Sequence, residues 1–233
     1  MWMSNDMNQN AGQEGIYQQA KDKFLHYTGA EDLRQAEGLF RQVGEYRQSA
    51  AYIEKCRTLL SYMPGCTVTF GRFEGKPIRW RVVDQRGKMR LLLAVEIVTR
   101  RCYHRTTLED ATWSDCSLRK WLNKDFLESA FTSAERMKIV PNKLQNLRNR
   151  KFYTQGGPDT MDRVHVPGVE EIERYMPEQA DRAGSDWWWL RCPGSNLFSA
   201  VAVYDDGTIY ENGIHIDYEG GGVRPAVWVL LKV

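Results

Sequence analysis

The hydrophobic pattern of the chain changes its period at Met63-Pro-Gly65, and this change limits the possible folds more than any other feature. Before this point, apolar residues such as Leu33, Ala36 and Phe40 recur at helical spacing. After it, short runs of β-branched and aromatic residues alternate with turns that contain Gly or Pro; the first three runs are 67–70, 78–83 and 89–95. The sequence therefore predicts a helical N-terminal part and a second domain that begins with three antiparallel strands.

The helical part is expected to form a helical hairpin over residues 13–61, after a polar, disordered tail at residues 1–12. Gly29 and Gly44 lie where helices would end. The stretch Ala36–Ala50 resembles a single tetratricopeptide-like hairpin, and one such unit cannot bury both of its faces. Two interpretations stay open: the hairpin serves self-association or partner docking, or it is a structural cap.

Helices are also expected in the middle of the second domain, residues 64–233. Ser114 is a candidate N-cap for the first of them. Thr132 and Glu135 have the spacing of a capping box that opens a second, and a third is expected at Val169–Met176. Because strands precede and follow these helices, the predicted fold class is α+β.

A basic cluster lies in the stretch 142–163, which is expected to be an exposed loop. Nucleic-acid binding would need aromatic side chains for base stacking, and only Phe152 and Tyr153 are available beside the basic residues. A solvated loop is the favoured interpretation, so no nucleic-acid partner is expected.

Charge and cysteine content say little about partners but more about the compartment. The 233 residues carry a net charge of +2, which favours no class of partner. The five cysteines are an odd number, none forms a C-x-x-C pair, and no secretory signal precedes them, so free thiols in the reducing cytoplasm are expected. No stretch of about 18 apolar residues occurs, so no membrane span is expected.

A search for catalytic and metal-binding patterns finds no established motif. The four histidines are scattered, without the spacing of metal ligands, and the chain has no nucleophile elbow, P-loop or dinucleotide fingerprint. The sequence therefore predicts no catalytic residue, metal or cofactor. One alternative stays open: an enzyme or calcium-dependent sugar binder that uses Asp205, Asp206 and Glu211.

The C-terminal segment, about residues 187–228, has a pattern typical of short strands that present polar side chains. Four aliphatic residues recur at intervals of six, seven and seven positions, namely Val203, Ile209, Ile216 and Val223. Turns rich in Tyr, Asp, Glu, Asn and Gly lie between them. Buried aliphatics would anchor the strands, and the polar side chains would form an adaptable binding surface.

Several motifs in order resemble a family of uncharacterised domains of gut bacteria and their phages. They are Trp80-Arg-Val-Val83, Trp113-Ser-Asp-Cys-Ser-Leu-Arg-Lys-Trp-Leu-Asn123, Phe126, Ala130-Phe131, Thr160-Met-Asp162, Trp187-Trp-Trp-Leu-Arg191, Pro193-Gly194 and Gly222-Val-Arg-Pro-Ala-Val-Trp228. The family is related in fold to C-type lectins and formylglycine-generating enzymes. The resemblance implies a C-type-lectin-like domain, preceded here by the helical hairpin.

Some members of this family resemble variable proteins of diversity-generating retroelements, in which adenine-directed mutagenesis rewrites codons near the C-terminus. The resemblance implies a set of diversified, ligand-binding residues between Gly194 and Gly222. They are Ser195, Asn196, Leu197, Phe198, Tyr204, Asp205, Asp206, Tyr210, Glu211, Asn212, His215, Asp217, Tyr218 and Glu219.

The chain also departs from the relatives of this family. It lacks the Glu-Pro-Asn and Trp-Asn-Asp motifs of calcium-dependent lectins and the paired C-terminal cysteines of formylglycine-generating enzymes. The expected function is therefore non-catalytic binding of a macromolecular ligand, most simply a protein, by a protein of the cytoplasm or of a phage particle. The other alternative is a structural carrier whose helical hairpin is the interaction module.

Overall fold

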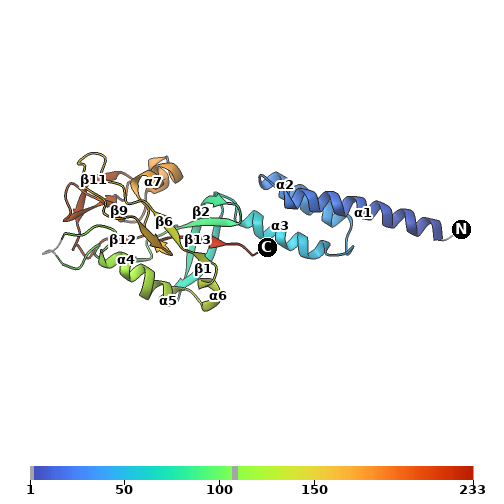
Figure 1. Ribbon diagram of the computed structural model, residues 1–233, viewed down its shortest axis with the longest axis horizontal. Coiled ribbons are helices and arrows are strands. Elements are labelled where there is room, and N and C mark those ends of the chain that lie inside the picture. Colours follow the sequence, from blue (N-terminus) through green and yellow to red (C-terminus); the bar gives the residue numbers. More distant parts are fainter. Residues whose placement is uncertain (1–2, 107–109, 233) are drawn as a thin grey trace. The chain divides into compact units, whose positions relative to one another are not determined.

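The structure is a computed structural model that describes residues 3–106 and 110–232, with the side chains of residues 10–106 and 110–232. The chain forms two compact units, one that runs to Cys66 and a second that comprises Thr67–Leu230 (Figure 1). The first is helical, and the second combines helices with antiparallel sheets. This confirms the predicted α+β class with N-terminal helices.

The first unit contains three helices: α1 (Met3–Leu25), α2 (Ala30–Gln42) and α3 (Ser49–Ser61). Helix α2 packs against both of the others, so the unit has one helix more than a single hairpin. Its core is aromatic, with Phe40 stacked on Tyr52 at 4.8 Å between ring centroids and Tyr17 edge-on to Phe40 at 5.7 Å. Gly44 follows α2 with a φ of 58°, as expected of a residue that ends a helix.

The expectation of a disordered tail at 1–12 is wrong for residues 3–12, which belong to α1; residues 1 and 2 lie outside the described residues. This stretch contains no proline. Once the packed part of a helix has formed, each added residue needs only one more hydrogen bond to extend it.

The second unit is built on two main sheets. The first has the order β1-β2-β3-β13-β5, with β8 also paired to β13, and the second has the order β11-β10-β9-β12-β4; β6 and β7 form a separate pair. The strands are β1 (Thr67–Phe73), β2 (Lys76–Arg86), β3 (Met89–Ala94), β4 (Thr99–Arg100), β5 (Ile139–Val140), β6 (Asn142–Leu144), β7 (Thr160–Asp162), β8 (Val164–His165), β9 (Trp188–Pro193), β10 (Ser199–Val203), β11 (Ile209–His215), β12 (Gly222–Val223) and β13 (Ala226–Leu230).

The hydrophobic core of this unit joins the two sheets to one helix. Leu91 and Trp228 come from the first sheet, Trp188 and Val203 from the second, and Ile172 from helix α7; all are nearly or fully buried. Because β13 pairs with β3, the last strand of the chain lies beside an early strand of the same unit. Figure 1 shows the β9–β11 sheet at one end of the unit and the β1–β2–β13 sheet at the other.

The helices of the second unit are short. They are α4 (Ser117–Trp121), a π-helical segment at Leu122–Phe126, α5 (Leu127–Ala130), α6 (Ser133–Arg136), α7 (Val169–Tyr175) and α8 (Gln179–Arg182). The predicted capping box is confirmed, because Thr132 and Glu135 exchange side chain to backbone hydrogen bonds at the start of α6. Helix α7 confirms the third predicted helix.

The predicted N-cap Ser114 is wrong: Cys116 caps α4, and its Sγ accepts a hydrogen bond from the Arg119 N–H at 3.4 Å. Ser114 lies in the preceding turn, where its hydroxyl is bonded to that of Thr112 at 2.8 Å. A thiol is a weak acceptor, so sequence preferences do not favour it as a cap.

The stretch 142–163 was expected to be an exposed loop, but it is not a loop throughout. Its two ends pair with each other as β6 and β7. Between them, the Asn149 side chain is 4% exposed, and its Nδ2 donates to the carbonyl oxygens of Pro193 and Glu211, each at 2.9 Å. This stretch therefore supports β9 and β11.

Candidate functional site

The fourteen candidate ligand-binding residues all lie at the surface of the second unit. None is buried, whereas Ala200, Val201, Ala202 and Val203 of β10 are each fully buried. The aliphatic residues between the candidates behave as predicted for three of four positions: Val203, Ile216 and Val223 are at most 1% exposed, and Ile209 is partly buried. The segment thus has buried anchors and an outward polar face.

Four candidates form a turn cluster at one end of the β10–β11 hairpin. They are Tyr204, Asp205, Asp206 and Tyr210. The turn is closed by the Tyr204 N–H, which donates to the Thr208 carbonyl at 2.8 Å. The Tyr204 and Tyr210 rings stack at 5.0 Å between centroids, so both tyrosines are half-buried rather than fully exposed as expected.

Nine candidates form a loop cluster at the other end of the hairpin. They are Ser195, Asn196, Leu197, Phe198, Asn212, His215, Asp217, Tyr218 and Glu219. Backbone hydrogen bonds join its two stretches: Ser195 N–H to the Asn212 carbonyl at 2.7 Å, and Ile216 N–H to the Phe198 carbonyl at 3.0 Å. The structure therefore brings these residues together, although they are up to 24 positions apart in the sequence, from Ser195 to Glu219.

Glu211 lies between the two clusters and is held in an ion-pair network. Arg150 donates to both carboxylate oxygens of Glu173 and to Oε1 of Glu211, with a shortest distance to Glu211 of 2.9 Å. Hydrogen bonds with Glu173 and then Glu211 raise the pKa of Arg150 above its ordinary value. Glu211 is half-buried, and its carboxylate is already paired with Arg150.

Glycines allow close backbone contact beneath the loop cluster. A Cβ atom on Gly194 would lie 2.4 Å from the Asn212 carbonyl oxygen and 2.9 Å from the Cα of Gly213. Gly213 itself has a φ of 83°, where side chains cause strain. These two positions therefore require glycine.

The tryptophans and arginines at the borders of the segment are structural. Trp188 and Trp189 are fully buried on opposite faces of β9, because successive side chains of a strand point to opposite faces. Arg191 is 7% exposed and pairs with Glu171 at 2.5 Å. The buried Arg224 donates from Nε to the Ala94 carbonyl at 3.0 Å, and burial lowers its pKa to about 10.

The three acids of the calcium or enzyme alternative do not form one site. Asp206 accepts hydrogen bonds from Thr208 within its own turn, Asp205 accepts from the Asp206 N–H, and Glu211 faces Arg150. In the part of the chain that the structure describes, no group of three or more His, Cys, Asp or Glu side chains could hold a metal ion. The nearest arrangement to catalytic chemistry in this segment is the His215 Nδ1 contact with Asp217 Oδ1 at 2.5 Å.

Burial makes the neighbouring thiols poor nucleophiles. It raises the pKa of Cys192 to about 11 and that of Cys116 to about 12, so neither ionises near neutral pH. All five cysteines are free in the structure.

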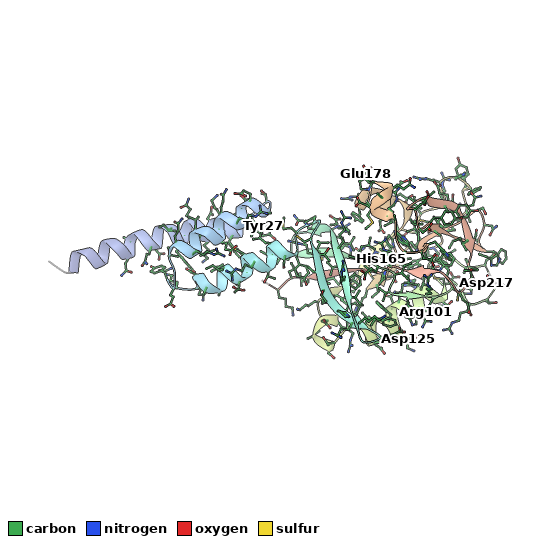
Figure 2. The ribbon with its side chains drawn as sticks, turned by 180° about the vertical axis from the view of Figure 1, so that it is seen from behind. Tyr27, Arg101, Asp125, His165, Glu178 and Asp217 are labelled. Carbon is green, nitrogen blue, oxygen red and sulfur yellow. The ribbon has the colours of Figure 1, made fainter. Side chains whose placement is uncertain are left out.

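A cavity of about 550 Å³ opens beside the loop cluster, at a place that no sequence motif predicted. Asp217 and Glu219 line it on one side, and Arg101, Ser117 and Trp121 belong to its other walls. Figure 2 labels Arg101 and Asp217, which lie toward the same end of the second unit. The sequence feature that could have indicated this cavity is the cluster of basic residues around Arg101, which lies next to Arg100 and four positions before Arg105.

Among the described residues, no helix has the length and apolar character that a membrane span needs.

Comparisons with known proteins give a family but no function. No curated protein and no solved structure matches the chain. Residues 88–231 match the model of the family described as "Domain of unknown function (DUF6273)", which covers more than half of the chain. The chain therefore belongs to the DUF6273 family.

Proposed function

We propose that this protein binds a macromolecular ligand, a protein, through the turn and loop clusters, and that it performs no catalysis there. The observation that carries the proposal is the contrast within the C-terminal segment: all fourteen candidate side chains reach the surface, while the β10 residues between them are fully buried. A frame of this kind can keep its fold while its outward residues change, because surface substitutions have small effects on stability.

The chemistry of the clusters supports protein recognition. Tyr204, Tyr210 and Tyr218 offer large contact areas with few torsions to immobilise, and the Asn, Asp and His side chains offer hydrogen bonds of both kinds. Tyr218 is 56% exposed and Phe198 is 38% exposed. Exposed aromatic side chains on a rigid frame are common anchors of protein interfaces.

The proposal includes a C-type-lectin-like fold for the second unit and diversification of the clusters by a retroelement. The pairing of β13 with β3, and a second sheet that carries the candidate residues, support the fold. The need for glycine at Gly194, which borders the candidate residues, and at Gly213, which lies between them, supports diversification. A reverse-transcriptase gene near the coding sequence, with a near-repeat that differs mainly at adenines, is the expected finding. Without both features, the diversification part of the proposal is wrong.

The binding function is tested with two sevenfold serine variants. The cluster variant replaces Tyr204, Asp205, Tyr210, Glu211, His215, Asp217 and Tyr218. The control variant replaces seven exposed residues elsewhere in the second unit, namely Lys120, Lys124, Glu128, Met137, Lys138, Met161 and Arg163.

Each protein is immobilised, and proteins retained from source-cell extract are identified by mass spectrometry and then titrated in purified form. A partner bound by the wild-type and the control variant, but lost from the cluster variant, supports the proposal. Retention by the folded cluster variant would place the function elsewhere, with the helical unit as the first region to test.

A further inference from the structure

We propose that the cavity beside the loop cluster binds a carboxylate, which the protein partner supplies as an Asp or Glu side chain. This inference rests on the proposed function and specifies the chemistry of its partner. The cavity has a volume of about 550 Å³ and is lined by Arg101, Ser117 and Trp121 together with the cluster residues Asp217 and Glu219. A partner seated on the loop cluster would therefore reach the cavity.

The backbone of Arg101 is held rigidly at the cavity. Its N–H donates to the Gly221 carbonyl, and its own carbonyl accepts from Trp189 Nε1, both at 2.8 Å. A Cβ on Gly221 would lie only 1.8 Å from Trp189 Nε1, so glycine is needed for this arrangement. The guanidinium is thus presented from a fixed point, which lowers the entropic cost of binding.

The guanidinium of Arg101 lies over the Trp121 ring, 4.0 Å from its centroid. The ring covers one face of the planar group and leaves its N–H edge as the part that can recognise a ligand. An arginine edge of this kind matches the two oxygens of a carboxylate through paired hydrogen bonds.

Two buried polar atoms of the cavity residues have no hydrogen-bond partner in the part of the chain that the structure describes. Arg101 Nε and Ser117 Oγ are both inaccessible to solvent and form no hydrogen bond within the described residues. Buried donors are nearly always paired in folded proteins. Both groups can donate, so they point to an acceptor that belongs at this place.

The charges of the cavity favour a singly charged anion. Arg100 is already neutralised by Asp186 at 2.7 Å, and Asp217 contacts His215. Among the described side chains, those of residues 10–106 and 110–232, Arg101 and Arg105 have no ion-pair partner, and Glu219 has none either. Arg101 and Arg105 thus offset the carboxylates of Asp217 and Glu219, and these two carboxylates would repel a doubly charged phosphate more than a singly charged carboxylate.

The test uses the full chain and two blocked tripeptides, N-acetyl-Gly-Glu-Gly-amide and its Gln counterpart, with acetate as the free acid. Binding is followed by NMR at the Arg101 Nε–H and the Trp121 indole N–H. It is followed independently by the alkylation rate of Cys102, which also lines the cavity and is half-buried. The variants are Arg101→Gln, Arg101→Lys and, as a matched control on an exposed arginine, Arg163→Gln.

The Glu peptide should shift both signals at millimolar concentration and slow the alkylation of Cys102, and the Gln peptide should do neither. Arg101→Gln should abolish binding, and Arg101→Lys, which keeps the charge but loses the planar edge, should weaken it by about tenfold. Arg163→Gln should bind normally. Equal effects of the Glu and Gln peptides, or undiminished binding by Arg101→Gln, would overturn the proposal.

Two further outcomes separate this inference from the proposed function. If acetate binds as tightly as the Glu peptide and the partner binds the Arg101→Gln protein normally, the cavity holds a free acid and its role in partner binding is refuted. If the partner is lost from the cluster variant but not from Arg101→Gln, the cavity inference fails while the proposed function stands.

Discussion

His165, on β8, is a buried ionisable residue whose protonation is coupled to folding. Its side chain is 1% exposed, and its Nδ1 has no hydrogen-bond partner among the described residues. Burial is the main cause that lowers its pKa to about 4, and Arg191 acts in the same direction against the opposite effects of Glu171 and Asp162. The neutral imidazole is therefore the form that fits the folded protein.

We predict that His165 makes the second unit less stable in mild acid. His165 takes up a proton at about pH 6.5 in the unfolded chain but only near pH 4 in the folded protein. The free energy of unfolding therefore decreases as the pH is lowered from 6.5 to 4. By about pH 5 the loss should reach about 2 kcal/mol. Urea unfolding of the wild-type and His165→Gln proteins at several pH values measures it.

The variant His165→Gln should show a flatter pH dependence of stability over this range than the wild-type protein. Glu171 does not confuse the comparison. Although burial opposes its ionisation, Arg191 and His165 hold its pKa below the ordinary value, so its contribution is lost only at lower pH. Parallel curves for the wild-type and His165→Gln proteins would contradict the prediction.

Gly194→Ala should destabilise the second unit by about 2 kcal/mol or more, because its new methyl group would overlap the Asn212 carbonyl and press on Gly213. The control is Gly184→Ala in the same unit, where the nearest atom would be 3.6 Å away and no strain is expected. Denaturant titration of both variants measures the difference. Equal stability of the two variants would show that the backbone can move apart at Gly194.

Among the elements, the β10–β11 hairpin shows what a periodic pattern can and cannot predict. The strands and their buried aliphatics follow from alternation, which a sequence displays directly. The contacts that hold the hairpin against the rest of the unit cannot be predicted from this alternation. Asn149 and Arg150 bind Glu211 from about 60 positions away, a contact that depends on how distant segments meet.

The hairpin should tolerate serine at the seven positions of the cluster variant. The variant loses the stacking of Tyr204 on Tyr210 and the contact of Glu211 with Arg150. Such an aromatic pair contributes about 1 kcal/mol and an exposed ion pair less, which leaves most of a typical stability of 5–15 kcal/mol, by order of magnitude. Circular dichroism and thermal unfolding should show a folded protein.

Trp228→Ala should behave in the opposite way. Trp228 is 3% exposed on β13, between β3 and β5, and it belongs to the core that joins both sheets. Cutting a buried tryptophan to alanine costs about 3–5 kcal/mol. A cluster variant that unfolds, or a Trp228→Ala protein with wild-type stability, would mean that core and surface are wrongly assigned in this segment.

At the scale of the whole molecule, the change of hydrophobic period at Met63–Gly65 correctly separated the N-terminal helices from the first strands. The cavity could not be predicted in the same way. Arg101 follows β4, Trp121 belongs to α4, and Asp217 comes from the far end of the chain, so only the folded structure brings them together. Spacing along a sequence reports on single elements, whereas a cavity depends on how several elements pack.

The chain should not need a metal for its stability, because its acids in the turns are bonded to local partners such as Thr208 and Arg150. Thermal unfolding with a chelator and with added calcium should give the same midpoint. A rise of several degrees with calcium would indicate a site that binds only in the folded state.

Under the proposed function, the distance between the two clusters would determine the size of partner that can contact both. Tyr210 and His215 lie at opposite ends of β11, and five strand residues span roughly 17 Å. One partner that covers both clusters would need a footprint typical of a full protein interface, on the order of 800 Å² on each side. A smaller molecule would touch one cluster alone. Under the proposed function, the two ends of the hairpin would therefore contact separate parts of a partner, so that a change at one end would alter specificity and leave the contacts of the other end in place.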